Sequence, residues 1–126
     1  MRVIDVTVRV SNPSAPEKRF EDRFIVDTGA VYSSVPEDRL DALGITAVGQ
    51  RAFLLPDGHT SQLRIGCALL RIEGFPDELP CPVIFAPMGS PCRLGATSLG
   101  CLGLEVDPTS ATLREREHHF LCGLHA

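Results

Sequence analysis

The segment Phe24-Ile25-Val26-Asp27-Thr28-Gly29-Ala30 joins an apolar strand to a turn that begins with a carboxylate. The apolar run before Asp27 predicts a buried strand, and Thr-Gly directly after it predicts a tight turn. Two interpretations fit this segment taken by itself. In the first, Asp27 only caps backbone N–H groups where a strand ends; in the second, the turn presents the carboxylate for chemistry.

The residues before this segment predict two strands. Residues 3–10 alternate, so that Ile4, Val6, Val8 and Val10 share one apolar face, as in a half-buried strand. Residues 11–18 contain two prolines, an asparagine and two serines, which predicts a turn-rich connection. A second strand over residues 19–26 then ends at Asp27.

The residues after the segment predict a strand, a short helix and a long hairpin. The strand covers residues 31–35, and the helix runs from Pro36 to Leu43, where Gly44 stops it. The hairpin has arms over 51–55 and 62–72, because the turn Pro56-Asp57-Gly58-His59 carries an Asp-Gly pair between apolar-rich flanks.

The last third of the chain predicts further short elements. An apolar strand over 81–85 and a loop over 88–92 lead to Leu94-Gly95-Ala96, after which Thr97 is expected to cap a short helix ending near Gly103. A second hairpin is predicted with arms 104–106 and 111–113. These many short strands joined by tight turns predict an all-β chain.

Length and composition bound the possible classes of protein. The chain has 126 residues, 44% hydrophobic and 22% charged, which suits one globular domain with its own core. Its formal net charge is −4 and its basic residues are scattered, which argues against nucleic acid as a partner. No apolar run approaches the roughly 20 residues that span a bilayer, and the start lacks a signal-peptide segment. We therefore expect no membrane partner and a cytoplasmic location.

The chain resembles the retropepsin-like aspartic proteases, the single-domain family that includes retroviral proteases and bacterial and cellular relatives. The resemblance rests on an apolar strand before Asp27-Thr28-Gly29-Ala30, on the small hydroxyl residues Ser33 and Ser34, and on Leu94-Gly95-Ala96 before a short helix and strand. It covers residues 1–113, which form the predicted domain, and leaves residues 114–126 as a tail of unknown role. Arg93 departs from the pattern, because the family usually has a second apolar residue there.

The resemblance implies a closed, homodimeric acid-protease fold and a role for each motif. Asp27 would be the catalytic carboxylate, Thr28 would orient the loop, Gly29 would allow close approach of substrate, and Ala30 would leave room beside the carboxylates. The turn Pro56-Asp57-Gly58-His59 would be the flap that folds over a peptide or protein substrate. Leu94-Gly95-Ala96 would be the structural second motif. The family's reaction needs neither a metal nor another cofactor.

A single Asp-Thr-Gly occurs in the chain, so the second carboxylate of an aspartic protease would have to come from a second copy. The resemblance therefore predicts an aspartic endopeptidase that hydrolyses peptide bonds between two Asp27 carboxylates, one from each subunit. The alternative is a non-catalytic relative that uses the same fold to bind a peptide or to join chains. A domain whose substrate is fused or delivered by another protein is a further alternative.

Three other features have competing interpretations. His59 either contacts substrate or is simply solvated, and the run 114–117 either lies in solvent or takes part in a dimer contact. Residues 117–125 hold three histidines and Cys122, which form either a zinc or nickel site or a frayed end. The odd number of cysteines predicts reduced thiols, with Cys67, Cys81, Cys92 and Cys101 as small core residues.

Overall fold

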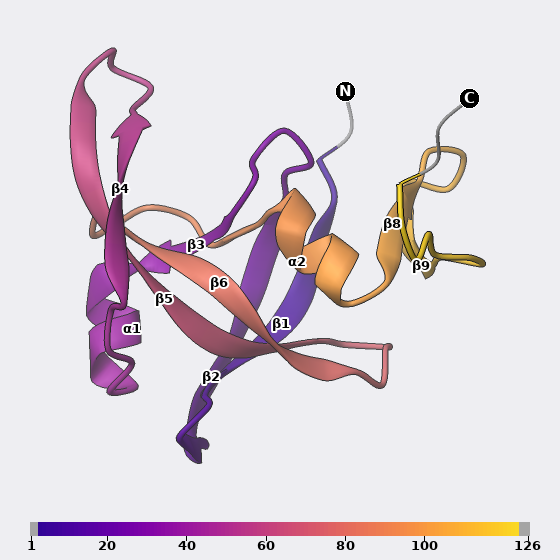
Figure 1. The fold of residues 1–126 in the computed structure, drawn as a ribbon, viewed down its shortest axis with the longest axis horizontal. Helices are drawn as coiled ribbons and strands as arrows, with labels where there is room; N and C mark the ends of the chain where they lie inside the picture. The colour runs from indigo at the N-terminus through magenta and orange to yellow at the C-terminus, as the bar shows by residue number, and fades with distance from the viewer. Residues whose placement is uncertain (1–2, 124–126) are drawn as a thin grey trace.

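Nine strands and two short helices make up the part of the chain that the computed structural model describes, residues 3–123 (Figure 1). The strands are β1 (Asp5–Asn12), β2 (Ala15–Val26), β3 (Ser33–Pro36), β4 (Gly49–Leu54), β5 (Thr60–Ile72), β6 (Glu78–Ala86), β7 (Arg93–Leu94), β8 (Leu104–Asp107) and β9 (Thr112–Glu115). The helices are α1 (Glu37–Ala42) and α2 (Ala96–Cys101). The expected all-β class is therefore confirmed as a mostly β chain with two short helices.

Seven of these strands form one sheet that closes on itself. Their order is β1-β2-β7-β3-β6-β5-β4, and β1 also pairs with β5, which joins the two sides of the sheet. Pairing is mixed, because β2 runs parallel to β7 and β3 runs parallel to β6. The closed architecture implied by the resemblance is thus present within one chain.

The N-terminal hairpin is longer than the sequence predicts. Residues 11–18 are not a turn-rich connection: β1 continues to Asn12 and β2 begins at Ala15, so that Pro13 and Ser14 make the turn. The Asn12 side chain stabilises this turn by accepting a hydrogen bond from the Ser14 N–H at 2.8 Å and donating one to the Leu43 carbonyl at 2.8 Å. The Pro and Ser content of these residues therefore predicted too long a loop, because one buried asparagine is enough to close a two-residue turn.

Both predicted helices are present, with one difference at a cap. Helix α1 follows Pro36, ends before Leu43 and is stopped by Gly44, whose φ is +74°, a value that favours glycine. Helix α2 begins at Ala96 with Gly95 at its N-cap position, so Thr97 lies inside the helix and does not cap it. The reason, given below, is that backbone carbonyls of the Asp27 loop accept the N–H groups at this end.

The other predicted strands are confirmed with shifted boundaries. The strand expected over 31–35 is β3, that over 81–85 lengthens to β6, and the arms of the long hairpin are β4 and β5. Strands β8 and β9 pair as the second hairpin and form a separate two-stranded sheet. Figure 1 shows this small sheet set apart from the main body.

Apolar residues on the inner face of the closed sheet form the core. The expected apolar face of the first strand is confirmed, because Val8 and Val10 are fully buried. Fully buried side chains from the other strands complete the core, among them Phe24, Val35, Leu70, Val83, Phe85 and Leu94. Phe24 lies on the strand that leads to Asp27, and Leu94 is the first residue of Leu94-Gly95-Ala96, so both motifs are tied to the core.

The cysteines are free thiols, as expected, but they do not all lie in the core. Cys81 and Cys92 are buried, Cys67 is partly buried, and Cys101 and Cys122 are exposed. The prediction for Cys101 was therefore wrong. Helix α2 buries Ser98 and Leu99, whereas Cys101 is its last residue and is exposed at that end of the helix.

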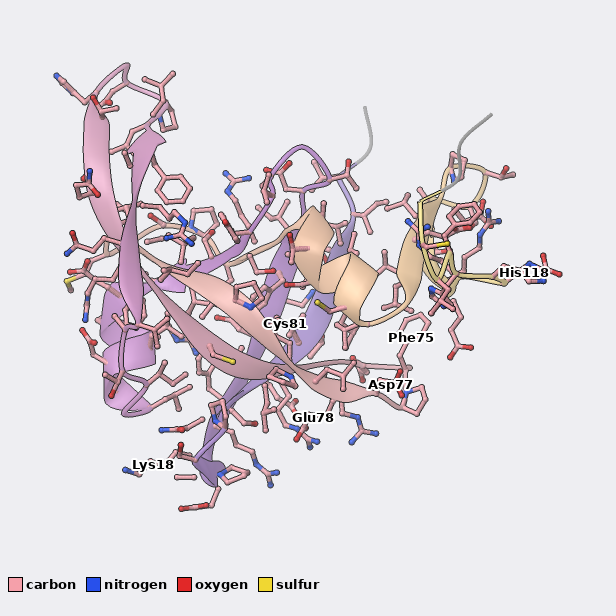
Figure 2. The ribbon with its side chains drawn as sticks, viewed as in Figure 1. Lys18, Phe75, Asp77, Glu78, Cys81 and His118 are labelled. Atoms are coloured by element: carbon pink, nitrogen blue, oxygen red, sulfur yellow. The ribbon has the colours of Figure 1, made fainter. Side chains whose placement is uncertain are left out.

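Side chains at the ends of the molecule lie in solvent. Figure 2 shows Lys18 beside the turn of the β1–β2 hairpin and His118 projecting away from the body of the molecule. Residues 114–117 are exposed within one chain, which fits both a solvated run and a dimer contact. Within residues 3–123, neither helix has the length and apolarity needed to cross a membrane.

Candidate active site

Asp27 lies immediately after β2, where two motifs distant in the sequence meet. The Asp27 N–H donates to the Leu94 carbonyl at 2.9 Å, and the Ile25 N–H donates to the Cys92 carbonyl at 2.9 Å. These bonds extend the parallel pairing of β2 with β7, in which Val26 is opposite Leu94. The structure thus places Leu94-Gly95-Ala96 directly beside the Asp-Thr-Gly turn.

The turn itself holds the Asp27 carboxylate in a defined orientation. The Ala30 N–H donates to the Asp27 carbonyl at 3.1 Å, and the Gly29 N–H donates to the carboxylate atom Oδ1 at 3.1 Å. Asp27 is 36% exposed at its side chain, while Thr28 and Gly29 are exposed. The carboxylate is therefore anchored by its own loop and is still accessible from solvent.

Beneath the turn, two buried hydroxyl groups connect the motifs. Ser33 Oγ and Ser98 Oγ lie 2.5 Å apart, and both residues are fully buried. Ser33 Oγ also accepts a hydrogen bond from the Gly95 N–H at 3.0 Å. The sequence drew attention to Ser33 as a small hydroxyl residue, but nothing in it indicated Ser98 as the partner.

The first turn of α2 is capped by the Asp27 loop. The Ala96 N–H donates to the Ala30 carbonyl at 2.8 Å, and the Thr97 N–H donates to the Val31 carbonyl at 2.9 Å. These bonds satisfy N–H groups that have no partner inside a helix, so a capping side chain is not needed. The loop and the helix therefore form one hydrogen-bonded unit.

Gly95 is required by the closeness of this packing. A Cβ atom at Gly95 would lie 2.5 Å from both the carbonyl carbon and the oxygen of Tyr32, and 2.9 Å from the Ser33 nitrogen. Gly29 is different, since a Cβ there would meet its nearest neighbour, Asp27 Oδ1, at 3.4 Å. Within one chain, backbone contacts therefore exclude any side chain at position 95, whereas they leave room for a Cβ at position 29.

Arg93 contributes a positive charge to the site. Its Nη1 lies 3.4 Å from Asp27 Oδ2, the carboxylate oxygen that the loop leaves free. Arg93 is the residue that departs from the family pattern, and its contact with Asp27 could not be inferred from the sequence because 66 positions separate the two.

The hairpin of β4 and β5 is built as the sequence predicts, with an exposed tip. The Leu55 N–H donates to the His59 carbonyl at 2.7 Å, and Gly58 has a φ of +89°. His59 Nδ1 lies 3.0 Å from Asp57 Oδ2, and Pro56, Asp57, Gly58 and His59 are all exposed. In Figure 1 this tip and the loop between β2 and β3 project toward the same edge of the molecule.

An aromatic contact links β4, close to the tip of this hairpin, to the Asp27 loop. The rings of Phe53 on β4 and Tyr32 meet edge to face, with centroids 6.5 Å apart. Within residues 3–123, no hydrogen bond or ion pair joins residues 56–59 to Asp27, so their role as a flap stays a prediction.

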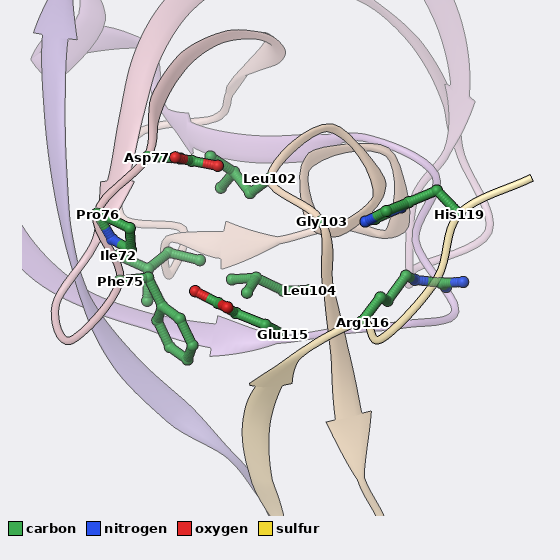
Figure 3. A pocket seen from close by; sticks show the side chains of 10 residues that line it. All are labelled: Ile72, Phe75, Pro76, Asp77, Leu102, Gly103, Leu104, Glu115, Arg116 and His119. Carbon is green, nitrogen blue, oxygen red and sulfur yellow. The ribbon is translucent and has the colours of Figure 1, made fainter. Parts of the chain in front are cut away.

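A pocket of about 290 Å³ lies elsewhere, between the β5–β6 turn and the residues after β9 (Figure 3). Apolar residues, including Phe75 and Leu104, line it together with Asp77, Glu115, Arg116 and His119. Across residues 3–123, no three His, Cys, Asp or Glu side chains are close enough to hold a metal ion. His125, part of the predicted tail cluster, lies outside the described residues.

Comparison with solved structures identifies the fold. No protein-family model and no curated protein sequence matches the chain. The EIAV protease, solved in complex with the inhibitor HBY-793, superposes with a TM-score of 0.55 at 14% sequence identity, covering 84% of this chain and 93% of that one. The chain therefore has the retropepsin-like fold, with its Asp-Thr-Gly turn hydrogen-bonded to its Leu-Gly-Ala element.

Proposed function

We propose that the protein is an aspartic endopeptidase that acts as a homodimer, with Asp27 of each subunit in one active site. The observation that supports this most is the bond from the Asp27 N–H to the Leu94 carbonyl, which joins the two family motifs within a retropepsin-like fold. An accessible carboxylate anchored on such a loop suits chemistry with solvent water.

The proposed reaction uses two carboxylates that share one proton, because two close carboxylates do not both ionise. The ionised carboxylate accepts a proton from a water molecule, whose oxygen forms a bond to the scissile carbonyl carbon. The protonated carboxyl donates its proton to the carbonyl oxygen. The C–N bond then breaks, the amine leaves with a proton, and the two carboxyl groups again share one proton.

A second chain is needed because one chain supplies a single Asp-Thr-Gly. A two-fold axis between two Asp27 loops would generate the pair from identical surfaces. The β8–β9 hairpin is available for such an assembly, since a two-stranded sheet has open edges that can pair with another chain. On this proposal, the monomer is inactive.

One observation favours the non-catalytic alternative. Arg93 approaches Asp27 Oδ2, an oxygen that a catalytic water would also have to reach. A chain in which this ion pair persisted would bind peptides at this site without cleaving them.

Cleavage of a diverse peptide library, followed by mass spectrometry from acidic to neutral pH, separates the two functions. Wild-type protein at a concentration that favours the dimer is expected to cut, and Asp27→Asn to cut nothing while remaining folded. Asp38→Asn, which removes an exposed carboxylate on α1, is the matched control. Equal cleavage by wild type and Asp27→Asn would refute the proposal, whereas binding without cleavage by a confirmed dimer would support the alternative.

A further inference from the structure

Arg93 is fixed at the centre of the site by its backbone. It lies on β7, between β2 and β3, where it is opposite Ile25 in the parallel pairing and opposite Ser34 in the antiparallel pairing. A residue held by strands on both sides has little freedom to move its Cα. Its side chain therefore starts from a fixed point beside Asp27, from which the guanidinium can contact either Asp27 or a peptide whose scissile carbonyl lies at Asp27.

The guanidinium has capacity to bind more than Asp27. It carries five N–H donors, and its contact with Asp27 is long, at 3.4 Å. The Arg93 side chain is 43% exposed, so part of the guanidinium faces solvent beside the carboxylate. This exposed part can donate two parallel hydrogen bonds to a further carboxylate, the geometry that arginine favours.

In a dimeric site, the two Arg93 side chains also carry more positive charge than the two Asp27 carboxylates neutralise. Two Asp27 carboxylates that share one proton carry one negative charge, whereas the two Arg93 side chains carry two positive charges. Two carboxylates on β1 and β2 have arginine partners of their own, since Asp5 pairs with Arg23 and Asp22 pairs with Arg39. The site therefore has an unmatched positive charge next to the reacting atoms.

We propose that Arg93 makes the site select substrates with an acidic side chain, Asp or Glu, next to the scissile bond. The inference rests on the proposed function and adds a substrate class to it. Where an apolar residue before Leu94 would favour an apolar substrate side chain, an arginine at the same place favours a carboxylate. Binding of that carboxylate also draws the guanidinium away from Asp27 Oδ2, which frees this oxygen for water.

The test uses pairs of peptides that differ only by Glu or Gln on either side of the cleaved bond. One Glu peptide has Glu before the cleaved bond and the other has Glu after it. For the one that wild type cleaves faster, we expect a kcat/KM about tenfold above that of the matched Gln peptide. Arg93→Met should abolish this preference, and Arg93→Lys should retain part of it. Arg71→Met, which removes an exposed arginine on β5, is the control and should leave the preference unchanged.

Two results would overturn the inference while leaving the proposed function intact. These are equal cleavage of Glu and Gln peptides by wild type, and an unchanged Glu preference in folded Arg93→Met. If wild type cleaved no peptide, the proposed function would fail. The affinity of the protein for the same Glu and Gln peptides, measured by fluorescence anisotropy, would then decide the inference. Tighter binding of the Glu peptides that is lost in Arg93→Met would support it, and equal binding would refute it.

Discussion

Ser33 and Ser98 share a buried hydrogen bond of 2.5 Å although 65 positions separate them in the chain. Ser33 belongs to the strand that follows the Asp27 loop, and Ser98 belongs to the helix that follows Leu94-Gly95-Ala96. Since Ser33 Oγ also accepts the Gly95 N–H, the pair connects both motifs at their base. The geometry of the carboxylate loop therefore depends on two hydroxyl groups that never contact solvent.

Removal of either hydroxyl should destabilise the protein and reveal coupling between the two residues. Ser33→Ala leaves the Gly95 N–H and Ser98 Oγ without their partner, so we expect a loss of about 2 kcal/mol in the free energy of unfolding. Ser98→Ala should cost about 1 kcal/mol. Urea unfolding at one fixed protein concentration gives the double-mutant cycle, in which a coupling energy near zero would contradict the pairing.

Substitution by alanine should have opposite effects on stability at Gly95, which precedes α2, and at Gly100, which lies within it. Gly95→Ala places a methyl group against the Tyr32 backbone, so we expect a loss of stability of about 3 kcal/mol or failure to fold. Gly100→Ala meets nothing within 4 Å and lies in the helix, so we expect a gain of about 0.5 kcal/mol. Thermal unfolding compares them, and a tolerated Gly95→Ala would show that the two motifs are less closely packed than described.

Thiol alkylation should separate the cysteines by burial. Burial raises the pKa of the Cys81 thiol to about 12 and also raises the pKa of Cys92, so neither forms the reactive thiolate near neutral pH. Exposed Cys101 and Cys122 should be modified first by iodoacetamide, and Cys81 and Cys92 only after unfolding. Mass spectrometry of timed samples measures this order. Modification of Cys81 as fast as Cys101 in folded protein would contradict the placement.

The ion pair between Asp22 and Arg39 should make a small, pH-dependent contribution to stability. The hydrogen bond from Arg39, whose guanidinium stacks 3.8 Å from the centre of the Phe20 ring, lowers the pKa of Asp22, as does the Arg23 N–H. A carboxyl whose pKa is lowered by folding stabilises the protein above its ordinary pKa, and this contribution is lost as the pH falls through the folded value.

Asp22→Asn should therefore lower the free energy of unfolding by less than about 1 kcal/mol at neutral pH, since the pair is partly exposed. The difference from wild type should begin to shrink as the pH falls below about 5 and should continue to shrink below the ordinary pKa of 3.8, because the folded pKa is lower still. Glu21→Gln, on the same strand, changes the net charge equally and is the control. A difference that stayed constant with pH would show that the ion pair has no such role.

The elements that the sequence predicted are those fixed by neighbouring residues. Alternation located β1, the apolar run located the end of β2 at Asp27, and the Asp57-Gly58 pair located the β4–β5 hairpin. Each of these signals lies within a few residues of the element it predicts. The length of the β1–β2 hairpin was misjudged because the Asn12 to Leu43 hydrogen bond that closes its turn comes from another part of the fold.

The arrangement of the site depended on contacts that no local pattern contains. Asp27 was located by its motif, but the Arg93 ion pair and the Ser33–Ser98 hydrogen bond each join residues more than 60 positions apart. Thr97 was expected to cap α2 because hydroxyl residues favour that position, yet the carbonyls of Ala30 and Val31 already satisfy the helix end. Backbone hydrogen bonds from a distant loop thus cap this helix in place of a hydroxyl side chain.

Mixing of subunits tests most directly whether two Asp27 residues form one site. Wild-type protein is equilibrated with a ninefold excess of folded Asp27→Asn, and cleavage of a peptide found with wild type alone is measured. If each site needs Asp27 from both chains, random pairing leaves about one tenth of the wild-type activity, because most wild-type subunits then pair with an inactive one. Full retention of activity after demonstrated subunit exchange would contradict the shared site.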